Sequence, residues 1–462
     1  MQPIQSDISQ GTSRVFRRRR PGAGPPGPKG LPFVGHLFDV RRDVLQYFTD
    51  CSRHYGDVVA LRFAGWPTLL LTSPEHIEQV LVRDHRKFVK NSFFWRQVTA
   101  IFGNGLLTSE GDFWVRQRRL AAPAFAGQRL SSYGPVMVQQ TERMLDGWEV
   151  GRGRDLHHDM MSLTLKIAAK ALFDAEVERD VAEIDDAVNV LANEIAVRFT
   201  RPFVIPDAIP LPSNIRYRRA LRRVEETVAR IIKERLRTGE DAGDLLSMLI
   251  KARDETGQPM SDRQLRDESI TILLAGHETT ALALSWTWLL LGQHPDIQAR
   301  LSEECAAVLG KRAATVEDLG QLVFAEHVVM EAMRLFPPAW AIGREAAQDC
   351  EIGGYPVASG TTIIMSPWVI HRDERHFQEP AEFRPDRWRD DLARRLPRFA
   401  YFPFGGGPRI CIGHRFAIME AVLILVTMVQ RFRLELQRDG PVETLPSITL
   451  RPKGGVWAAP LA

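Results

Sequence analysis

A glycine-rich segment around one cysteine constrains this chain more than any other feature. It spans residues 401–413 and reads YFPFGGGPRICIG. Its three consecutive glycines, residues 405–407, allow the backbone to approach a flat ligand closely. We expect Cys411 to open a helix. The free N–H groups at the N-terminus of that helix would stabilise a thiolate. The segment therefore predicts a turn that presents one thiolate to a ligand.

Other side chains of this segment suit such a ligand. Phe404 can shield the sulfur from water, and Arg409 can offer a fork of donors to a carboxylate such as a haem propionate. The ordinary alternative is an inert, buried cysteine in a glycine loop. However, the segment matches F-x-x-G-x-R-x-C-x-G at every fixed position, namely Phe404, Gly407, Arg409, Cys411 and Gly413. A chance match of this length is improbable.

With this motif the chain resembles the cytochrome P-450 family of haem-thiolate monooxygenases. The resemblance implies haem b (iron protoporphyrin IX) as the cofactor, Cys411 as the metal ligand, and Phe404 and Gly413 beside the haem. It also implies a mainly α fold with a small β region, in which the haem lies between the long central helix and the cysteine-loop helix. An axial thiolate pushes electron density onto iron and favours O–O cleavage.

A second site interrupts an apolar helix expected over residues 270–291. Ala275, Gly276 and Thr279 share one helix face by their i, i+3 and i+4 spacing. Small residues there leave room for a macrocycle and dioxygen, and the Thr279 hydroxyl can bond to the carbonyl four residues earlier. We expect Thr279 to hold dioxygen and a water, and Glu278 to relay protons. The two residues resemble the family's acid-threonine pair.

Three further residues match the family's haem-propionate ligands. Trp114 and Arg118 are four apart on one expected helix, and Arg344 stands in the segment AIGREA. An indole N–H and a guanidinium on one face suit a carboxylate. Taken alone, the residues could equally be a core tryptophan and surface arginines.

A charged pair is predicted in an otherwise apolar helix. Glu331 and Arg334 are three apart and face the same way, and Arg387 could supply a further partner. The ordinary alternative is a surface ion pair. The set resembles the family's Glu-Arg-Arg triad, whose role is structural.

The segments that the family places over the haem are almost free of polar side chains. The candidate pocket residues are Phe94, Ile101, Phe102, Phe203, Ala275, Trp340, Ile342 and Ile448. Each could also be ordinary core. A pocket without polar anchors cannot hold a polar substrate against water, so we expect a long, lipophilic one. Residues 334–344 and 449–455 look like those of bacterial fatty-acid, terpenoid and carotenoid hydroxylases.

The chain has 462 residues, which alone would suggest two or three domains. A large central cofactor changes this expectation, so we predict one domain over residues 31–462. It follows a basic, Pro/Gly-rich tail, residues 1–30, that we expect to be disordered. Helices are expected over 134–147, 156–173, 180–198, 214–237, 262–293 and 411–432, and a β-hairpin over 57–73.

The expected reaction is insertion of one oxygen atom from dioxygen into an apolar substrate. Two electrons would come from a separate partner, a ferredoxin fed by a ferredoxin reductase. The alternatives are a haem-thiolate peroxygenase or isomerase, and a non-catalytic haem-binding sensor. The presence of both Glu278 and Thr279 argues against the peroxygenase and the isomerase.

Composition bears on location and partners. The tail has a net charge of +5 and the whole chain has +3, so the remaining residues carry −2. This balance argues against nucleic-acid binding. The four cysteines are scattered, which suits a reducing cytoplasm. The apolar run at 270–292 holds a polar tetrapeptide at its middle, residues 277–280, so we expect no transmembrane anchor.

Overall fold

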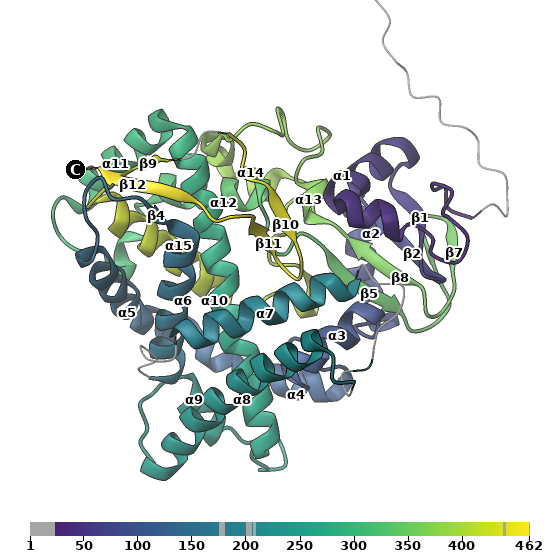
Figure 1. Ribbon diagram of the computed structural model, residues 1–462, viewed down its shortest axis with the longest axis horizontal. Coiled ribbons are helices and arrows are strands. Elements are labelled where there is room, and N and C mark those ends of the chain that lie inside the picture. Colours follow the sequence, from purple (N-terminus) through teal and green to yellow (C-terminus); the bar gives the residue numbers. More distant parts are fainter. Residues whose placement is uncertain (1–23, 175–180, 200–205, 207–208, 438–439, 462) are drawn as a thin grey trace, which may run out of the picture.

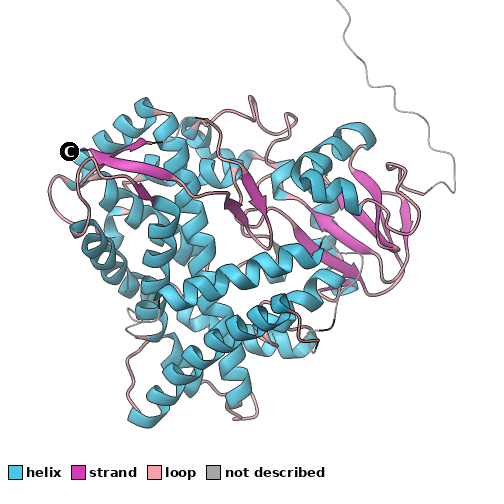
Figure 2. Cartoon of the chain, viewed as in Figure 1, coloured by secondary structure: helices cyan, strands magenta, loops and turns pink. Residues whose placement is uncertain are grey.

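The computed structural model describes residues 24–174, 181–199, 206, 209–437 and 440–461. Helices make up most of the molecule, and the largest sheet lies at one end of it (Figures 1 and 2). The predicted fold class, mainly α with a small β region, is confirmed.

The helices surround one long central helix, α10 (Figure 1). They are α1 (Leu37–Tyr55), α2 (Pro74–Glu78), α3 (Phe93–Phe102), α4 (Gly111–Ala121), α5 (Gly127–Asp146), α6 (Leu156–Phe173), α7 (Val181–Phe199), α8 (Pro212–Thr238), α9 (Leu245–Lys251), α10 (Asp262–Gln293), α11 (Pro295–Leu309), α12 (Val323–Leu335), α13 (Pro367–Ile370), α14 (Leu392–Arg395) and α15 (His414–Val429).

The strands form four small sheets among the described residues. They are β1 (Val58–Phe63), β2 (Trp66–Leu71), β3 (Phe88–Val89), β4 (Arg154–Asp155), β5 (Ile342–Ala346), β6 (Cys350–Ile352), β7 (Tyr355–Val357), β8 (Thr362–Met365), β9 (Arg433–Leu436), β10 (Thr444–Pro446), β11 (Leu450–Pro452) and β12 (Trp457–Leu461). The largest sheet has the order β1-β2-β8-β5-β3, with β2 and β8 parallel. The other sheets pair β4-β12-β9, β6-β7 and β10-β11.

The predicted hairpin is present as β1 and β2. Its strands are antiparallel, with Phe63 opposite Trp66. Ala64 and Gly65 form the turn, and both have positive φ angles, 46° and 90°. Two positive φ angles in a two-residue loop match the right-handed twist of the flanking strands.

The central helix α10 starts with a capping box. The Ser261 hydroxyl accepts from the backbone N–H of Gln264, and the Gln264 side chain accepts from the Ser261 N–H. From Asp267 onward α10 is mostly buried, and its neighbours include α6, α12 and α15. The apolar core therefore has α10 as its axis, and a smaller apolar cluster lies against the largest sheet.

The structure corrects two boundaries. Residues 24–30, assigned to the tail, pack on β1: the Ala60 N–H donates to the Pro26 carbonyl at 2.7 Å, and a ring nitrogen of His36 lies 3.2 Å from the Pro28 carbonyl oxygen. The last long helix begins at His414, so Cys411 precedes it instead of opening it. Pro26 supplies a backbone acceptor to β1 in the first case, and Gly413 is the helix N-cap in the second.

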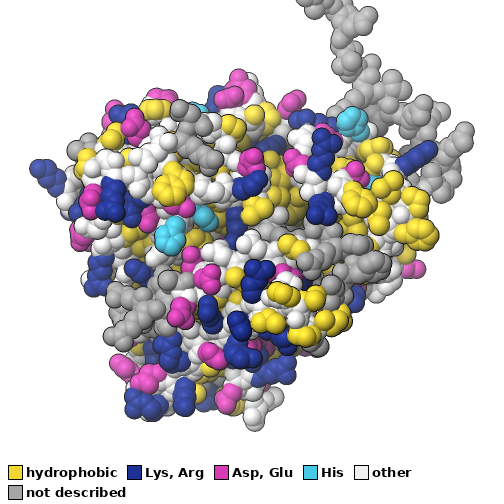
Figure 3. Space-filling model, viewed as in Figure 1, with side chains coloured by type: hydrophobic (Ala, Val, Ile, Leu, Met, Phe, Trp, Pro, Cys, Tyr) yellow, Lys and Arg dark blue, Asp and Glu magenta, His cyan; other side chains and the backbone are white. Residues whose placement is uncertain are grey.

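Basic and acidic side chains are interspersed over α8 and α9 on the face that Figure 3 shows. Within the described ranges, no helix is long and apolar enough to cross a membrane.

Candidate active site

The cysteine loop is held by its own backbone. The Cys411 N–H donates to the Phe404 carbonyl at 3.0 Å, which closes the loop before α15. Gly407 has a φ of +67°, and a Cβ there would lie 1.9 Å from the Leu81 carbonyl oxygen. Only glycine fits that position. The loop leaves Cys411 exposed, whereas Cys305 is buried.

The surroundings of the Cys411 sulfur act on it in opposite directions. Although the side chain is exposed, the protein around it raises the pKa of the thiol, while the Gly413 N–H and the Arg118 charge lower it. The net shift is upward, and the nearby N–H group and the cation are the groups that favour a thiolate. Their effect does not depend on Cys411 belonging to the helix.

Four cations gather near this loop. Arg118 lies on α4, Arg344 on β5 and Arg409 in the cysteine loop, and Lys90 follows β3. Burial lowers the pKa of each of the four, and that of Arg344 to about 10. Neighbouring cations lower the pKa of Lys90 and Arg344 further. The cations are therefore close enough to repel one another.

The hydrogen-bond partners of Lys90, Arg344 and Arg409 are mostly backbone carbonyl oxygens. The Arg409 guanidinium donates to the Ser109 carbonyl at 2.7 Å and to the Glu110 carboxylate at 2.6 Å. The Lys90 ammonium donates to the Leu107 carbonyl at 2.5 Å. Arg344 donates to the Gly343 carbonyl at 2.8 Å. Among the described residues, Glu110 is the carboxylate that contacts the cluster.

This surplus of positive charge fits the two carboxylates of a haem. Trp114 lies in the same cluster, with the Arg409 guanidinium 4.0 Å and the Arg118 guanidinium 6.0 Å from its ring centroid. Of the cluster, Trp114, Arg118, Arg344 and Arg409 were predicted from the sequence. Lys90 and Glu110 were not, because no motif marks them.

On one face, the middle of α10 carries small and uncharged residues, in contrast to the cationic cluster. The Thr279 hydroxyl donates to the Ala275 carbonyl at 2.7 Å, and that of Thr280 to the Gly276 carbonyl at 3.4 Å. Ala275 is exposed and Thr279 half-buried, while residues 270–274 and 280–291 are buried. A Cβ on Gly276 would meet only Leu172, at 4.0 Å. This stretch therefore presents small residues and one hydroxyl to accessible space.

Glu278 binds a partner that the sequence reasoning missed. Its Oε1 accepts from Arg451 on β11, at 2.8 Å from Nε and 2.6 Å from Nη2, and from the Thr449 hydroxyl at 2.6 Å. Burial alone would raise the pKa of Glu278, but Arg451 and Thr449 outweigh it and hold the pKa below its usual value. Glu278 is therefore an anion held by a cation.

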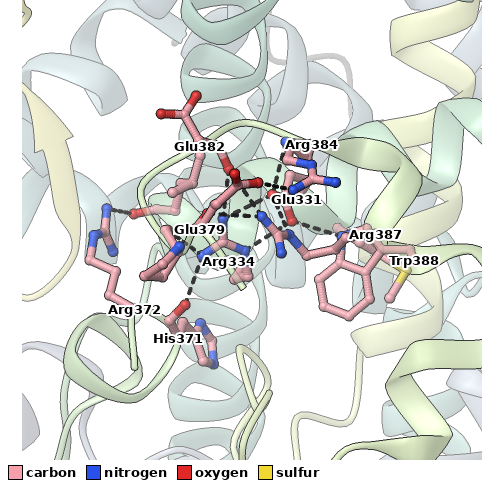
Figure 4. A network of polar contacts seen from close by, with 12 residues as sticks. Glu331, Arg334, His371, Arg372, Glu379, Glu382, Arg384, Arg387 and Trp388 are labelled. Atoms are coloured by element: carbon pink, nitrogen blue, oxygen red, sulfur yellow. Dashed lines mark hydrogen bonds and ion pairs between the residues drawn. The ribbon is translucent and has the colours of Figure 1, made fainter. Parts of the chain in front are cut away.

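The predicted charged set is brought together by the structure (Figure 4). Glu331 and Arg334 are fully buried on α12, with the Arg334 Nη2 2.8 Å from the Glu331 Oε1. The Arg387 Nε lies 2.9 Å from the same oxygen. Trp388 was not predicted, yet its indole N–H donates to the other oxygen at 3.0 Å.

The pocket candidates come from separate elements. The Ile342 side chain lies 3.5 Å from where a Cβ on Gly405 would be, so it borders the cysteine loop. The Trp340 indole N–H donates to the Ser447 carbonyl at 2.9 Å, beside Ile448. Ile101 and Phe102 are buried on α3, and Phe94 is half-buried there. Ala275 is exposed on α10. Phe203 lies outside the described residues.

Comparison with known proteins identifies the family. A family model for cytochrome P450 matches residues 25–458. The chain is 37% identical to the cyclooctatin synthase of Streptomyces melanosporofaciens, over 92% of this chain and 91% of the relative. It is 36% identical to the cyclooctat-9-en-7-ol 5-monooxygenase of that organism, over 90% of each chain. It is 34% identical to the pentalenene oxygenase of Streptomyces avermitilis, over 92% of this chain and 94% of the relative.

The chain therefore belongs to the cytochrome P450 family. It is a haem-thiolate monooxygenase, an oxidoreductase with a haem-iron cofactor. It uses dioxygen, a lipophilic substrate and electrons from a separate redox partner.

Proposed function

We propose that this enzyme hydroxylates an apolar molecule, with cyclic terpenoids as the first candidates and fatty acids and carotenoid-like molecules next. The relatives carry this proposal, because proteins named for cyclooctatin, cyclooctat-9-en-7-ol and pentalenene match 90% or more of the chain. The apolar candidates Ile101, Phe102 and Ile342 support it, since a pocket with few polar groups favours a lipophilic ligand.

We further propose that the cofactor is haem b, with Cys411 as its axial ligand. Arg118, Arg344 and Trp114 would hold the propionates, and Phe404 would cover the sulfur. The cationic cluster around them supports this assignment, because buried cations need anionic partners. We include Lys90 among the proposed propionate ligands. We include Arg409 as well, because its guanidinium lies beside Trp114. When bound, the haem supplies the activation of dioxygen.

The protein's own contribution would be to position the substrate and deliver protons. The Thr279 hydroxyl, now bonded to the Ala275 carbonyl, can turn its proton toward dioxygen or a water molecule in the site. Glu278 would supply protons to Thr279 once its carboxylate leaves Arg451. We propose a ferredoxin, reduced by a ferredoxin reductase, as the electron donor. We also propose one domain, which starts before the predicted residue 31 because residues 24–30 pack on β1. We propose the cytoplasm as the location, which the four unpaired cysteines support.

A titration series tests the substrate class. Diterpenes, sesquiterpenes, fatty acids, steroids and carotenoids would be added to the purified holoprotein, and the spin state of the iron read by absorbance. We expect apolar terpenes to give the largest shift, and incubation with a surrogate ferredoxin system to give a singly oxygenated product. If small polar compounds shift the spin state and the lipids do not, the proposed substrate class is wrong.

The same incubation separates the alternatives. A monooxygenase consumes NAD(P)H and dioxygen with product formation. A peroxygenase would form product only with added peroxide, an isomerase would need no reductant, and a haem-binding sensor would form none.

A further inference from the structure

A buried polar cluster continues from Glu278 toward the surface on α7. Arg451, which binds Glu278, also donates from Nη1 to the Asn189 side-chain oxygen at 2.7 Å. Asp185 lies four residues before Asn189 on α7, so both side chains share one helix face. The cluster therefore joins α10, β11 and α7 through charged and amide groups.

Asp185 sits between this cluster and solvent. The residue is only 9% exposed, and its Oδ1 is buried with no hydrogen-bond partner among the described residues. Its Oδ2 lies 3.7 Å from Nδ1 of His158 on α6. The His158 side chain is 67% exposed. A solvent-exposed imidazole thus contacts a carboxylate whose other oxygen is buried.

The electrostatics give the two carboxylates different proton affinities. Burial raises the pKa of Asp185, Glu278 and Asp186 raise it further, and His158 and Arg451 lower it, with a net upward shift. The pKa of Glu278 is shifted downward instead, by Arg451 and Thr449. The surroundings therefore favour the protonated form of Asp185 and the anionic form of Glu278.

Two buried histidines of the cluster carry no charge at neutral pH. Burial lowers the pKa of His157 on α6 to about 4, and that of His277 on α10 to about 4 as well. The negative charge of Glu278 is balanced by Arg451. Asp185 is thus the carboxylate of this cluster whose protonated form the surroundings favour.

We propose that Asp185 is a proton-relay residue on the solvent side of Glu278, and that His158 loads it. The proposal rests on the proposed role of Glu278 and Thr279. One proton passes from Nδ1 of protonated His158 to the Asp185 carboxylate, and His158 regains a proton from bulk water. Asp185 passes the proton to the Glu278 carboxylate and becomes a carboxylate again. No electron moves, and Arg451 keeps its protons.

The chain offers a matched control in the next residue. Asp186 has a 66% exposed side chain, and its Oδ2 lies 3.4 Å from a guanidinium nitrogen of Arg223. Asp185→Asn and Asp186→Asn therefore make the same chemical change one residue apart. The Asp185 variant removes the proposed proton carrier, whereas the Asp186 variant removes only a charge beside it, so only the Asp185 variant should interrupt the relay.

The first measurement does not depend on turnover. An infrared pH titration of the holoprotein, labelled in its aspartate carboxyl carbons, should show a protonated carboxyl band that persists above the usual range of aspartate. Asp185→Asn should remove this band, and Asp186→Asn should keep it. A band that survives in Asp185→Asn would overturn the assignment.

The second measurement uses dioxygen as the substrate. Holoprotein reduced by a surrogate ferredoxin system, without organic substrate, is scored for peroxide released per dioxygen consumed, from pH 6 to pH 8. Slower proton delivery lets more peroxide escape, so Asp185→Asn should raise this ratio at least twofold and flatten its pH dependence. If Asp185→Asn folds poorly, the exposed His158→Gln carries the test and should flatten the same profile.

Glu278→Gln and Thr279→Ala complete the set. If both raise the peroxide ratio while Asp185→Asn and His158→Gln match wild type, the relay inference is wrong and the proposed function stands. If none of the four variants changes the ratio, the proposed role of Glu278 and Thr279 fails and the inference fails with it.

Discussion

At the scale of single residues, Glu331 has the densest set of partners in the predicted charged set. Its two oxygens accept from Arg334 at 2.8 and 2.9 Å, from the Arg387 Nε at 2.9 Å, from the Arg384 backbone N–H at 3.0 Å and from the Trp388 indole at 3.0 Å. The remaining Arg334 donors reach the carbonyls of His371, Pro380 and Glu382. The buried Glu331–Arg334 pair thus fastens residues 371–388 to α12 (Figure 4).

Removing this carboxylate should destabilise the whole protein. Glu331→Ala leaves two buried guanidinium groups without their anion, and breaking a buried pair in this way costs about 3–5 kcal/mol. Chemical denaturation and the yield of haem-loaded protein would measure the loss. Glu326→Ala, an exposed change on the same helix, is the control and should stay within about 0.5 kcal/mol of wild type. Equal stability of the two variants would contradict a structural role for Glu331.

Contacts within one helix could be predicted from the sequence, whereas contacts between distant segments could not. The spacing of Glu331 and Arg334 predicts a common face, because helix geometry is local. The spacing of Glu278 and Thr279 suggests a direct relay, but the Glu278 carboxylate is bound to Arg451, 173 residues further along the chain. Residues 449–455 resemble those of other hydroxylases, yet no local rule assigns Arg451 a partner. Such contacts arise only when distant segments pack together.

At the scale of elements, the connection between α3 and α4 is held by two buried acids of α10. The Asn104 N–H donates to Asp267 at 2.9 Å, and the Leu106 N–H donates to Glu268 at 2.9 Å. At its far end the connection is bound by Lys90 and Arg409, through the carbonyls of residues 107 and 109. It therefore ties the cationic cluster to the central helix.

Glu268 should make stability depend on pH. Burial raises its pKa to about 7, above the usual value of about 4.3 in an unfolded chain. The folded state then binds the proton more tightly, so this stabilisation is complete below about pH 4 and is lost as the pH rises through about 7. Glu268→Gln mimics the neutral acid and cannot titrate. Between pH 5 and pH 8, wild type should lose about 2–3 kcal/mol more unfolding free energy than this variant.

Denaturant titrations of both proteins at the two pH values measure this difference. Glu420, which is also buried and whose pKa is raised to about 8, titrates in both proteins and so cancels. Identical pH dependence in wild type and Glu268→Gln would show that Glu268 does not titrate in this range.

Element boundaries were predictable to different degrees. The predicted ranges 156–173 and 262–293 are those of α6 and α10, because strong apolar patterns and clear caps define both helices. The cysteine helix was predicted three residues too early, since glycine and cysteine at its start do not fix a cap. The packing of residues 24–30 on β1 could not be predicted, because prolines and glycines carry no periodic signal.

At the scale of the whole molecule, the proposed haem ligands come from distant parts of the chain. Arg118 lies on α4, Arg344 on β5 and Cys411 before α15. A cofactor bound by all of them would link these regions into one cooperative unit. The sequence supplied the motif residues of this site, while Lys90 and Glu110 emerged only from the packing.

Haem should therefore stabilise the chain as one unit. A ligand that binds only the folded state at a thousand times its Kd adds about 4 kcal/mol. We expect haem added to the apoprotein to raise the midpoint of a single thermal transition, and Arg344→Gln to reduce this gain. Arg415→Gln, an exposed change beside the cysteine loop, should leave it intact. Equal gains in Arg344→Gln and wild type would remove Arg344 from the haem site.

The absorbance spectrum of the ferrous carbonyl complex tests the central claim, thiolate ligation of the haem iron by Cys411, most directly. Wild type should give the red-shifted Soret band of a thiolate ligand, and so should Cys350→Ala, which removes a half-buried cysteine elsewhere. Cys411→Ala should lose the band. A red-shifted band that persists in Cys411→Ala, or that is absent from haem-loaded wild type, would contradict the assignment.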